Sequence, residues 1–127
     1  MTDEIEIYNN GTNKMTAVAN EHSFDSVLTC FDCAVEVWGF AGNCSIYVYK
    51  NEIDSLVKRL QQMNERLTGE VTIESREDAY YLKFRFIKNV LQISGKMEVP
   101  EACSLVFKFD ADQTAIIPLI TLLRKLQ

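Results

Sequence analysis

The sequence of 127 residues has only one histidine, and it lacks the motifs of the common catalytic folds. The single histidine, His22, would have to serve any Ser-His-Asp or Cys-His site. No serine lies in a G-x-S-x-G motif, and no P-loop or G-x-G-x-x-G glycine loop precedes a predicted helix. The carboxylate pairs Glu77–Asp78 and Asp110–Asp112 fall at predicted turns, where acids cap backbone N–H groups. The sequence therefore predicts a protein that is not an enzyme.

The chain also lacks a long apolar run and a basic, apolar N-terminus. A membrane-spanning helix needs roughly 18 apolar residues, whereas the longest apolar segment, Ala115–Leu123, is interrupted by Pro118 and Thr121. The first residues, Met1–Ile5, are acidic and do not have the charge pattern of an export signal. We therefore expect a cytoplasmic protein that does not bind a membrane.

Metal-binding cysteine patterns are incomplete. Cys30 and Cys33 form a C-x-x-C string, but no second C-x-x-C or H-x-x-x-H string completes a zinc site. The string lies in an alternating, β-branched segment, where a separation of three places two side chains on opposite faces of a strand. We therefore expect Cys30, Cys33, Cys44 and Cys103 to be free thiols in a reducing compartment, with no metal and no cofactor.

Positive charge is scarce in the first third of the sequence. Residues 1–40 hold seven acidic residues and one basic residue, Lys14, which gives a net charge of −6. The whole chain has a net charge of −5, and general nucleic-acid binding is therefore not expected. The acidic third is either a solubilising surface or a docking face for a basic partner, since such a field speeds encounter.

Alternation of apolar and polar residues predicts most of the strands. A first short strand is expected around Ile5 and Ile7, followed by turn residues 9–13, and no element is predicted over residues 17–25. A long strand over 26–40, a turn at Ala41–Asn43 and a strand over Cys44–Tyr49 predict a hairpin. Four further strands are predicted after Gly69, around the segments 71–74, 80–87, 91–99 and 105–110. Turns are expected at Glu77–Asp78 and Lys88–Asn89, and Pro100 is expected to end the third of these strands.

Two helices are predicted from spacings of three and four. The first covers about Glu52 to Leu67, with Asn51 as a candidate N-cap and Gly69 as a candidate C-cap. The second begins near Pro118, after a cap or turn at Asp112–Thr114, because proline is favourable in a first helical turn.

The short connections between strands predict an α+β fold of one domain over residues 1–127. Its sheet is mostly antiparallel, a sandwich-like arrangement is compatible with it, and two amphipathic helices pack against it. Matched apolar faces predict a shared core containing Phe31, Val35, Leu60, Phe84, Phe86, Ile93, Phe107, Leu119 and Leu122.

Two further groups of residues each have two possible interpretations. The aromatic residues Tyr80, Phe84, Phe86, Phe107 and Phe109 could line a ligand cavity, although alternating aromatics are more often plain core. A small basic-aromatic patch of Tyr81, Lys83, Arg85 and Lys88 is more typical of a solvated sheet face.

Several segments from residue 42 onward resemble the WapI-type bacterial immunity proteins. The most distinctive is Asp112-Gln113-Thr114, which lies between the last strand and the leucine-rich helix. The others are Gly42-Asn43-Cys44, Ile53-x-x-Leu56-x-x-x-Leu60, Leu67-x-Gly69, Tyr81–Phe86, Val90-x-Gln92-Ile93-Ser94-Gly95 and Leu105–Ala111. The resemblance covers residues 42–127 and implies an antidote that binds and neutralises a cognate toxin, without catalytic residues. A small-ligand-binding module and an enzyme of another kind are the alternatives.

Partner binding is best assigned to the acidic first third. Asp32, Glu36 and Trp38 are the candidate residues, because the predicted strand over 26–40 places all three on the face opposite its apolar positions. Buried aromatic residues contribute most to the affinity of protein interfaces. The alternative for Trp38 is a tryptophan packed under a loop or helix.

Overall fold

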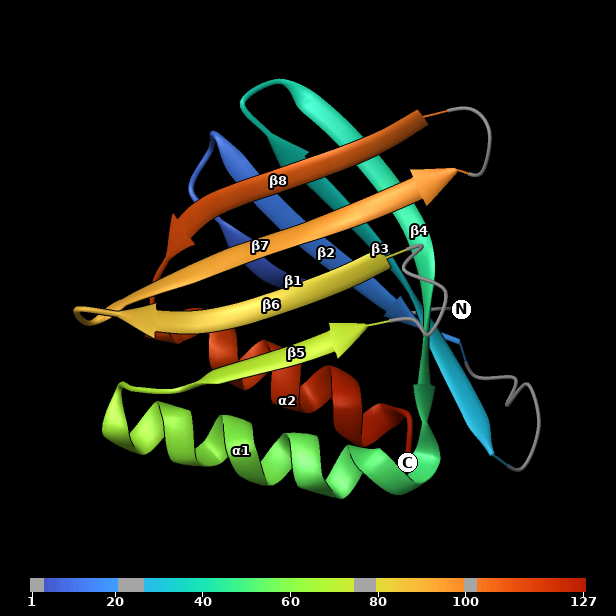
Figure 1. Ribbon diagram of the computed structural model, residues 1–127, viewed down its shortest axis with the longest axis vertical. Coiled ribbons are helices and arrows are strands. Elements are labelled where there is room, and N and C mark those ends of the chain that lie inside the picture. Colours follow the sequence, from blue (N-terminus) through green and yellow to red (C-terminus); the bar gives the residue numbers. More distant parts are fainter. Residues whose placement is uncertain (1–3, 21–26, 75–79, 100–102) are drawn as a thin grey trace.

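The computed structural model describes residues 4–20, 27–74, 80–99 and 103–127 (Figure 1). These residues form two four-stranded antiparallel sheets, each a meander in chain order. Sheet A contains β1 (Glu4–Asn9), β2 (Asn13–Ala19), β3 (Leu28–Val37) and β4 (Phe40–Tyr49). Sheet B contains β5 (Glu70–Glu74), β6 (Tyr80–Ile87), β7 (Val90–Val99) and β8 (Cys103–Ala111). The predicted α+β class, antiparallel pairing and order of strands and helices are confirmed.

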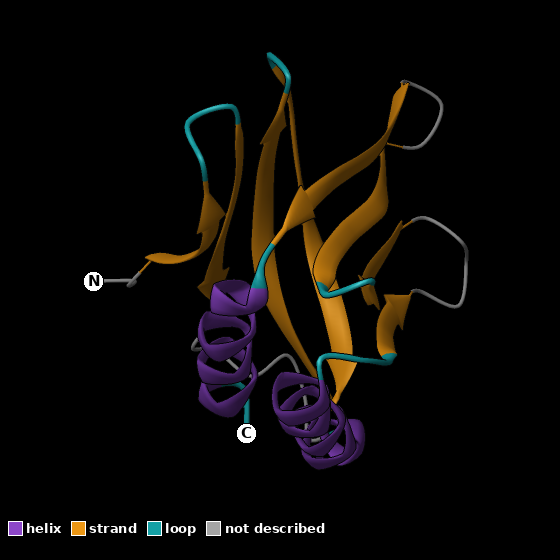
Figure 2. Cartoon of the chain, turned by 90° about the vertical axis from the view of Figure 1, so that its left-hand side faces the viewer, coloured by secondary structure: helices purple, strands orange, loops and turns teal. Residues whose placement is uncertain are grey.

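The two sheets pack face to face and the helices close one end of the sandwich (Figures 1 and 2). The rings of Tyr8 on β1 and Phe109 on β8 stack with centroids 5.9 Å apart, which joins the two sheets. Helix α1 (Ile53–Arg66) packs against β5, and α2 (Ile116–Lys125) packs against β1, β2 and α1.

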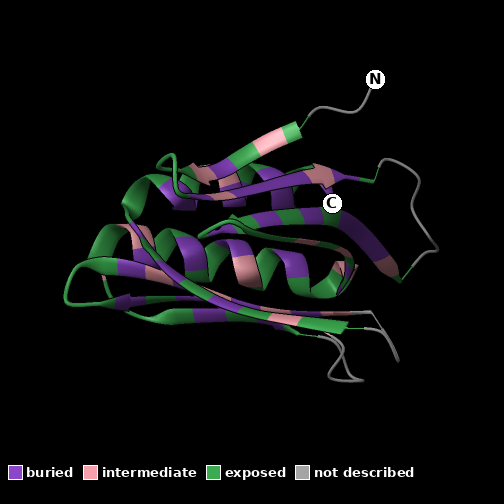
Figure 3. Ribbon diagram, turned by 90° about the horizontal axis from the view of Figure 1, so that it is seen from above, coloured by how far each residue is buried: buried purple, intermediate pink, exposed green. Residues whose placement is uncertain are grey.

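One hydrophobic cluster fills the space between the sheets and the helices. Buried and more exposed positions alternate along most of the strands, as Figure 3 shows. Burial of each large apolar side chain contributes about 1.5–3 kcal/mol. The nine predicted core residues all belong to this cluster: Phe31, Val35, Leu60, Phe84, Phe86, Ile93, Phe107, Leu119 and Leu122.

The first predicted hairpin turn is wrong by several residues. Strand β3 ends at Val37, and Trp38 and Gly39 form a two-residue turn with φ values of 51° and 86°. Such a turn needs positive φ at both positions, which Gly39 adopts without cost. The predicted turn residues Ala41–Asn43 instead lie in β4, paired with β3.

The helix caps differ in part from the prediction. Asn51 lies within a 3-10 turn (Lys50–Glu52) that precedes α1, and is therefore not an N-cap. Leu67, with a φ of 55°, ends α1 in the left-handed conformation in place of Gly69. The cap before the second helix is confirmed, since the Asp112 carboxylate accepts a hydrogen bond from the Thr114 backbone N–H at 2.9 Å.

Strand β2 was missed, because none of its residues is exposed and its alternation is therefore weak. The predicted turn at Glu77–Asp78, the strand end at Pro100 and the histidine His22 lie outside the described residues. The turns predicted within residues 9–13 and at Lys88–Asn89 are confirmed, and both residues of the second turn have positive φ.

Candidate partner-binding site

Two of the candidate residues, Asp32 and Glu36, lie on the outer face of sheet A. They alternate along β3 with Cys33, Val35 and Val37, which point into the sandwich and are buried. Period-two alternation therefore holds both carboxylates on the solvent side, as predicted.

The same face carries the acidic residues of β1. Glu4 and Glu6 are exposed and pair with Val18 and Thr16 of β2, so they share the outer face with Asp32 and Glu36. The basic residue on this face is Lys14, directly across from Glu36 in the β2–β3 register. The fold thus gathers acids from two strands on one sheet surface.

The outer face of sheet B has a different charge pattern. Its acidic and basic residues are equal in number: Glu70, Glu74, Glu98 and Asp110 against Lys83, Arg85, Lys96 and Lys108. The ion pairs found within the described ranges lie here, including Lys83–Glu70 at 3.3 Å. Two basic residues of the predicted basic-aromatic patch, Lys83 and Arg85, therefore have Glu70 as a neutralising neighbour, whereas the acids of sheet A have only Lys14 as a basic residue on the described part of their face.

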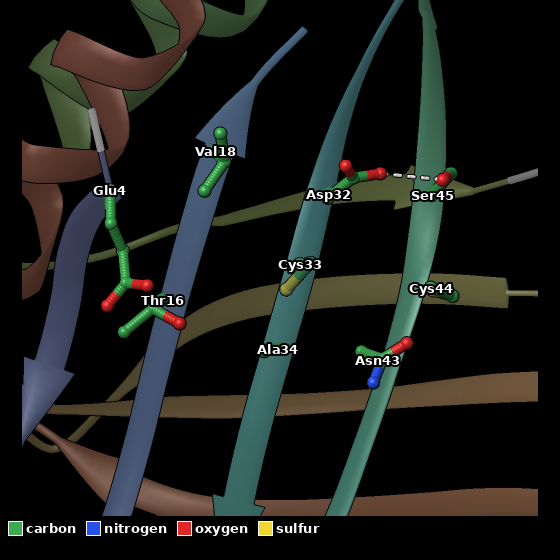
Figure 4. A pocket seen from close by; sticks show the side chains of 9 residues that line it. All are labelled: Glu4, Thr16, Val18, Asp32, Cys33, Ala34, Asn43, Cys44 and Ser45. Carbon is green, nitrogen blue, oxygen red and sulfur yellow. Dashed lines mark hydrogen bonds between the residues drawn. The ribbon is translucent and has the colours of Figure 1, made fainter. Parts of the chain in front are cut away.

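Small side chains make a shallow depression in the middle of the acidic face (Figure 4). It has a volume of about 430 Å³ and is lined by Glu4, Thr16, Val18, Asp32, Cys33, Ala34, Asn43, Cys44 and Ser45. The Ser45 hydroxyl donates a hydrogen bond of 2.6 Å to the Asp32 carboxylate and fixes its position.

The paired thiols at this depression are poor nucleophiles. Cys33 and Cys44 are directly opposite each other in the β3–β4 register. Burial raises the pKa of Cys44 to about 11, with a smaller contribution from the Asp32 carboxylate. Burial also raises the pKa of Cys33, with Cys44 as a second cause. Both thiols therefore stay protonated near neutral pH, and only the thiolate form attacks substrates.

Trp38 does not lie on the strand face assigned to it. It occupies the β3–β4 turn, and 72% of its surface is exposed, so it is not packed under a loop or helix. Its neighbour Phe40 is 69% exposed, which places two large apolar side chains at the tip of this hairpin. Exposed aromatics of this kind are typical of binding surfaces.

The turn nevertheless brings Trp38 and Glu36 together. Both line a hollow of about 570 Å³ with Gly11, Thr12, Gly39 and Ala41, where the β1–β2 and β3–β4 turns are neighbours. A carboxylate and an indole in one hollow are suited to a Lys or Arg side chain, through an ion pair and a cation–π contact. Asp32, farther along β3, lines the separate depression described above.

Of the carboxylate pair predicted at a turn, only Asp112 has the capping role. Asp112 caps the segment before α2, whereas Asp110 lies within β8, on its outer face. Within the described ranges, no group of three or more His, Cys, Asp or Glu residues is placed to hold a metal ion. The same ranges contain no helix of the length and hydropathy needed to cross a membrane.

The aromatic residues considered as a cavity lining fill the interior of the sandwich. Phe84, Phe86, Phe107 and Phe109 are buried in the common core. Tyr80 reaches across to sheet A, where its hydroxyl group accepts a hydrogen bond from the Tyr47 N–H at 2.8 Å.

Comparison with known protein families shows which family the chain belongs to. The model of the immunity protein WapI-like family matches residues 4–126. The chain belongs to the WapI-like immunity protein family. The match begins well before residue 42, so the resemblance found in the sequence was too short. Strands β1–β3 are part of the family domain, and the acidic face is built on them.

The fold also occurs in a solved structure. A chain described as "Crystal structures of trypanosoma bruciei MRP1/MRP2" has a TM-score of 0.54 and 11% sequence identity, over 98% of this chain and 82% of that chain. At this identity, the likeness shows a shared fold alone. No curated protein matches the WapI-like chain in sequence.

Sequence reasoning missed Glu4 and Glu6 on the acidic face and Phe40 at the tip of the β3–β4 hairpin. The strand alternation of β1 would have placed both glutamates on one face. Phe40 could have been found by weighing Trp38-Gly39 against Ala41–Asn43 as the hairpin turn.

Proposed function

We propose that this WapI-like chain acts as one cytoplasmic domain that binds a cognate toxin domain and neutralises it without catalysing a reaction. Membership of an immunity protein family supports a toxin as the general kind of partner. The observation that carries the proposal is the difference between the two outer faces, because the acids of sheet A have few basic neighbours while sheet B is balanced.

The acidic face suits a basic toxin surface. Asp32, Glu36, Glu4 and Glu6 supply a field that attracts positive charge over about 8 Å in physiological salt. Trp38 supplies an apolar anchor at the edge of that field. In this arrangement the acids speed encounter, and the tryptophan contributes to the lifetime of the complex.

The two alternatives receive less support. A small-ligand module needs a deep, mostly enclosed pocket, whereas the hollows described above are surface features over sheet A and its turns. An enzyme needs an activated nucleophile or base, and the thiols nearest the central depression have raised pKa values.

A neutralisation assay tests the proposal. The cognate toxin domain is first sought in the genes that flank the gene of this chain. When that domain is produced in cells, we expect it to arrest growth and the WapI-like chain to restore growth. With purified proteins, we expect loss of toxin activity to be complete at one equivalent, together with a 1:1 complex by light scattering. Neutralisation at far below one equivalent would instead indicate an enzyme, and failure of both assays would contradict the proposal.

A further inference from the structure

Strand β4 forms an edge of sheet A and differs from the other sheet edges. Natural proteins protect edge strands with charged side chains, prolines, bulges or short length. Strand β1 has a bulge between Glu6 and Tyr8, β5 has five residues, and β8 carries Lys108 and Asp110. Strand β4 has ten residues, contains no charged residue and no proline, and pairs with β3 without a register shift.

The register shows which backbone groups of β4 face outward. A two-residue hairpin turn closes on a hydrogen-bonded pair, here Val37 and Phe40, and such pairs alternate with non-bonded pairs along an antiparallel ladder. The odd-numbered residues of β4 therefore direct their N–H and C=O groups away from β3. The Tyr80 hydroxyl confirms this direction, since it bonds both the N–H and the C=O of Tyr47.

Part of this edge is open. Ala41, Asn43 and Ser45 are exposed, and their outward backbone groups have no hydrogen-bond partner among the described residues. The Tyr80 hydroxyl occupies the groups of Tyr47 and limits the open edge on one side. The open edge thus consists of residues 41–45, close to the Trp38 turn.

We propose that the open edge of β4 accepts an extended segment of the toxin as a fifth strand of sheet A, with basic side chains at alternate positions. This inference rests on the proposed function and specifies how the partner docks. Strand addition supplies main-chain hydrogen bonds for affinity, and alternate side chains supply specificity.

Charge and side-chain size on the outer face select basic residues. In the β3–β4 register, Ala41 lies opposite Glu36, and Ser45 lies opposite Asp32. An added strand would lie about 10 Å from β3, which is two strand spacings. The small side chains of Ala41 and Ser45 leave room for a Lys or Arg to reach across β4 toward these carboxylates.

The same charges disfavour a second copy of this chain as the occupant. Pairing of β4 with β4 of another copy would join the two A sheets into one continuous sheet that carries the acidic residues of both copies. Asp32 and Glu36 would then approach like charges, with no basic residue on either β4 strand to compensate them.

A proline substitution tests the edge directly. Asn43→Pro removes an outward N–H and leaves the β3–β4 hydrogen bonds in place, which is the position where an edge strand tolerates proline. We expect this variant to bind the toxin domain of the neighbouring gene about tenfold more weakly, since one partner acceptor loses its donor. The matched control Asn43→Ala also loses the amide side chain but keeps the N–H, so the loss of affinity that belongs to the N–H is the difference between Asn43→Pro and Asn43→Ala. Circular dichroism and a thermal midpoint check that both variants fold.

Amide hydrogen exchange on the unchanged chain gives a second measurement that needs no variant. We expect the amides of Ala41, Asn43 and Ser45 to exchange rapidly in the free chain and slowly in the complex. Gly42 and Cys44, which bond to β3, should be protected in both states. A complex that forms without protection of the edge amides would overturn the inference and leave the proposed function standing.

Two other outcomes are also decisive. If the edge amides become protected as the concentration of the chain alone rises, the occupant is a second copy and the inference is wrong. If the toxin domain does not bind at all, the proposed function fails first and the inference fails with it.

Discussion

At the scale of single residues, Trp38 breaks a local rule. Its φ of 51° lies in the left-handed region, where side chains other than Gly, Asn and Asp are unfavourable. The first position of a two-residue hairpin turn is most often Asn, Asp or Gly. A large aromatic residue that is 72% exposed at such a position adds nothing evident to stability. Departures from local preference of this kind are expected at functional sites.

We therefore predict that Trp38→Asn stabilises the free chain and weakens the complex. The free energy of unfolding should rise by about 1 kcal/mol, because Asn tolerates the left-handed conformation. The affinity for the toxin domain should fall by about tenfold or more, since an exposed aromatic anchor is lost. Urea denaturation measures the first effect, and calorimetric titration measures the second.

The matched control is Lys88→Asn in the β6–β7 turn. Lys88 has a φ of 50° and occupies the position equivalent to Trp38 in a hairpin of the opposite sheet. This variant should gain a similar stability without a change in affinity. If Trp38→Asn bound the toxin domain as tightly as the unchanged chain, Trp38 would not be part of the interface.

At the scale of elements, strong periodicity made the prediction of α1 and the β6–β7 hairpin reliable. The buried residues of α1 recur at steps of three and four, and β6 alternates almost without exception. The β3–β4 hairpin offered two turn signals, Trp38-Gly39 and Ala41–Asn43, which differ in register. The prediction followed the second signal and therefore placed Trp38 on a strand, whereas Trp38 lies in the turn.

Strand β2 and the end of α1 were not predictable by the same means. Alternation is weak in β2, since five of its seven positions are buried and the other two, Lys14 and Val18, are half-buried. The general preference for glycine at a helix end pointed to Gly69. Leu67 ends α1 instead, and its side chain packs against the core, which is a tertiary contact that the local sequence does not reveal.

Close packing between the strands makes a further prediction at Gly95 on β7. A Cβ atom at this position would lie 2.6 Å from Cζ of Phe107 and 2.7 Å from the backbone oxygen of Tyr81. Because the backbone atom cannot move aside easily, Gly95→Ala should lower the free energy of unfolding by about 1–3 kcal/mol. The neighbouring outer-face variant Ser94→Ala should change it by less than about 0.5 kcal/mol. Equal denaturation midpoints for the two variants would show that the packing around Gly95 is wrong.

At the scale of the whole molecule, the division of the chain explains the acidic face. Sheet A is built entirely from residues 4–49, and sheet B from residues 70–111. A charge imbalance in the first third of the sequence therefore becomes an imbalance between two opposite faces of the sandwich. The net charge of that third was visible in the sequence. Its concentration on one outer face was not, because it depends on the register that joins Glu4 and Glu6 to Asp32 and Glu36.

The open edge of β4 could not be predicted from the sequence either. An uncharged stretch from Phe40 to Tyr49 is equally compatible with a central strand. Only the strand order shows that β4 lies at the edge, and only the Tyr80 hydrogen bonds show which part of that edge is already occupied.

The measurement that tests the central claim most directly is the association rate with the neighbouring toxin domain at increasing salt. An acidic docking face should raise this rate by about 10–1000-fold at low salt, and the gain should disappear as salt screens the field. Asp32→Lys with Glu36→Lys should remove most of the gain, whereas the sheet B control, Glu74→Lys with Asp110→Lys, changes the net charge equally and should keep it. A rate that does not depend on salt, or that responds equally to both double variants, would contradict recognition through the outer face of sheet A.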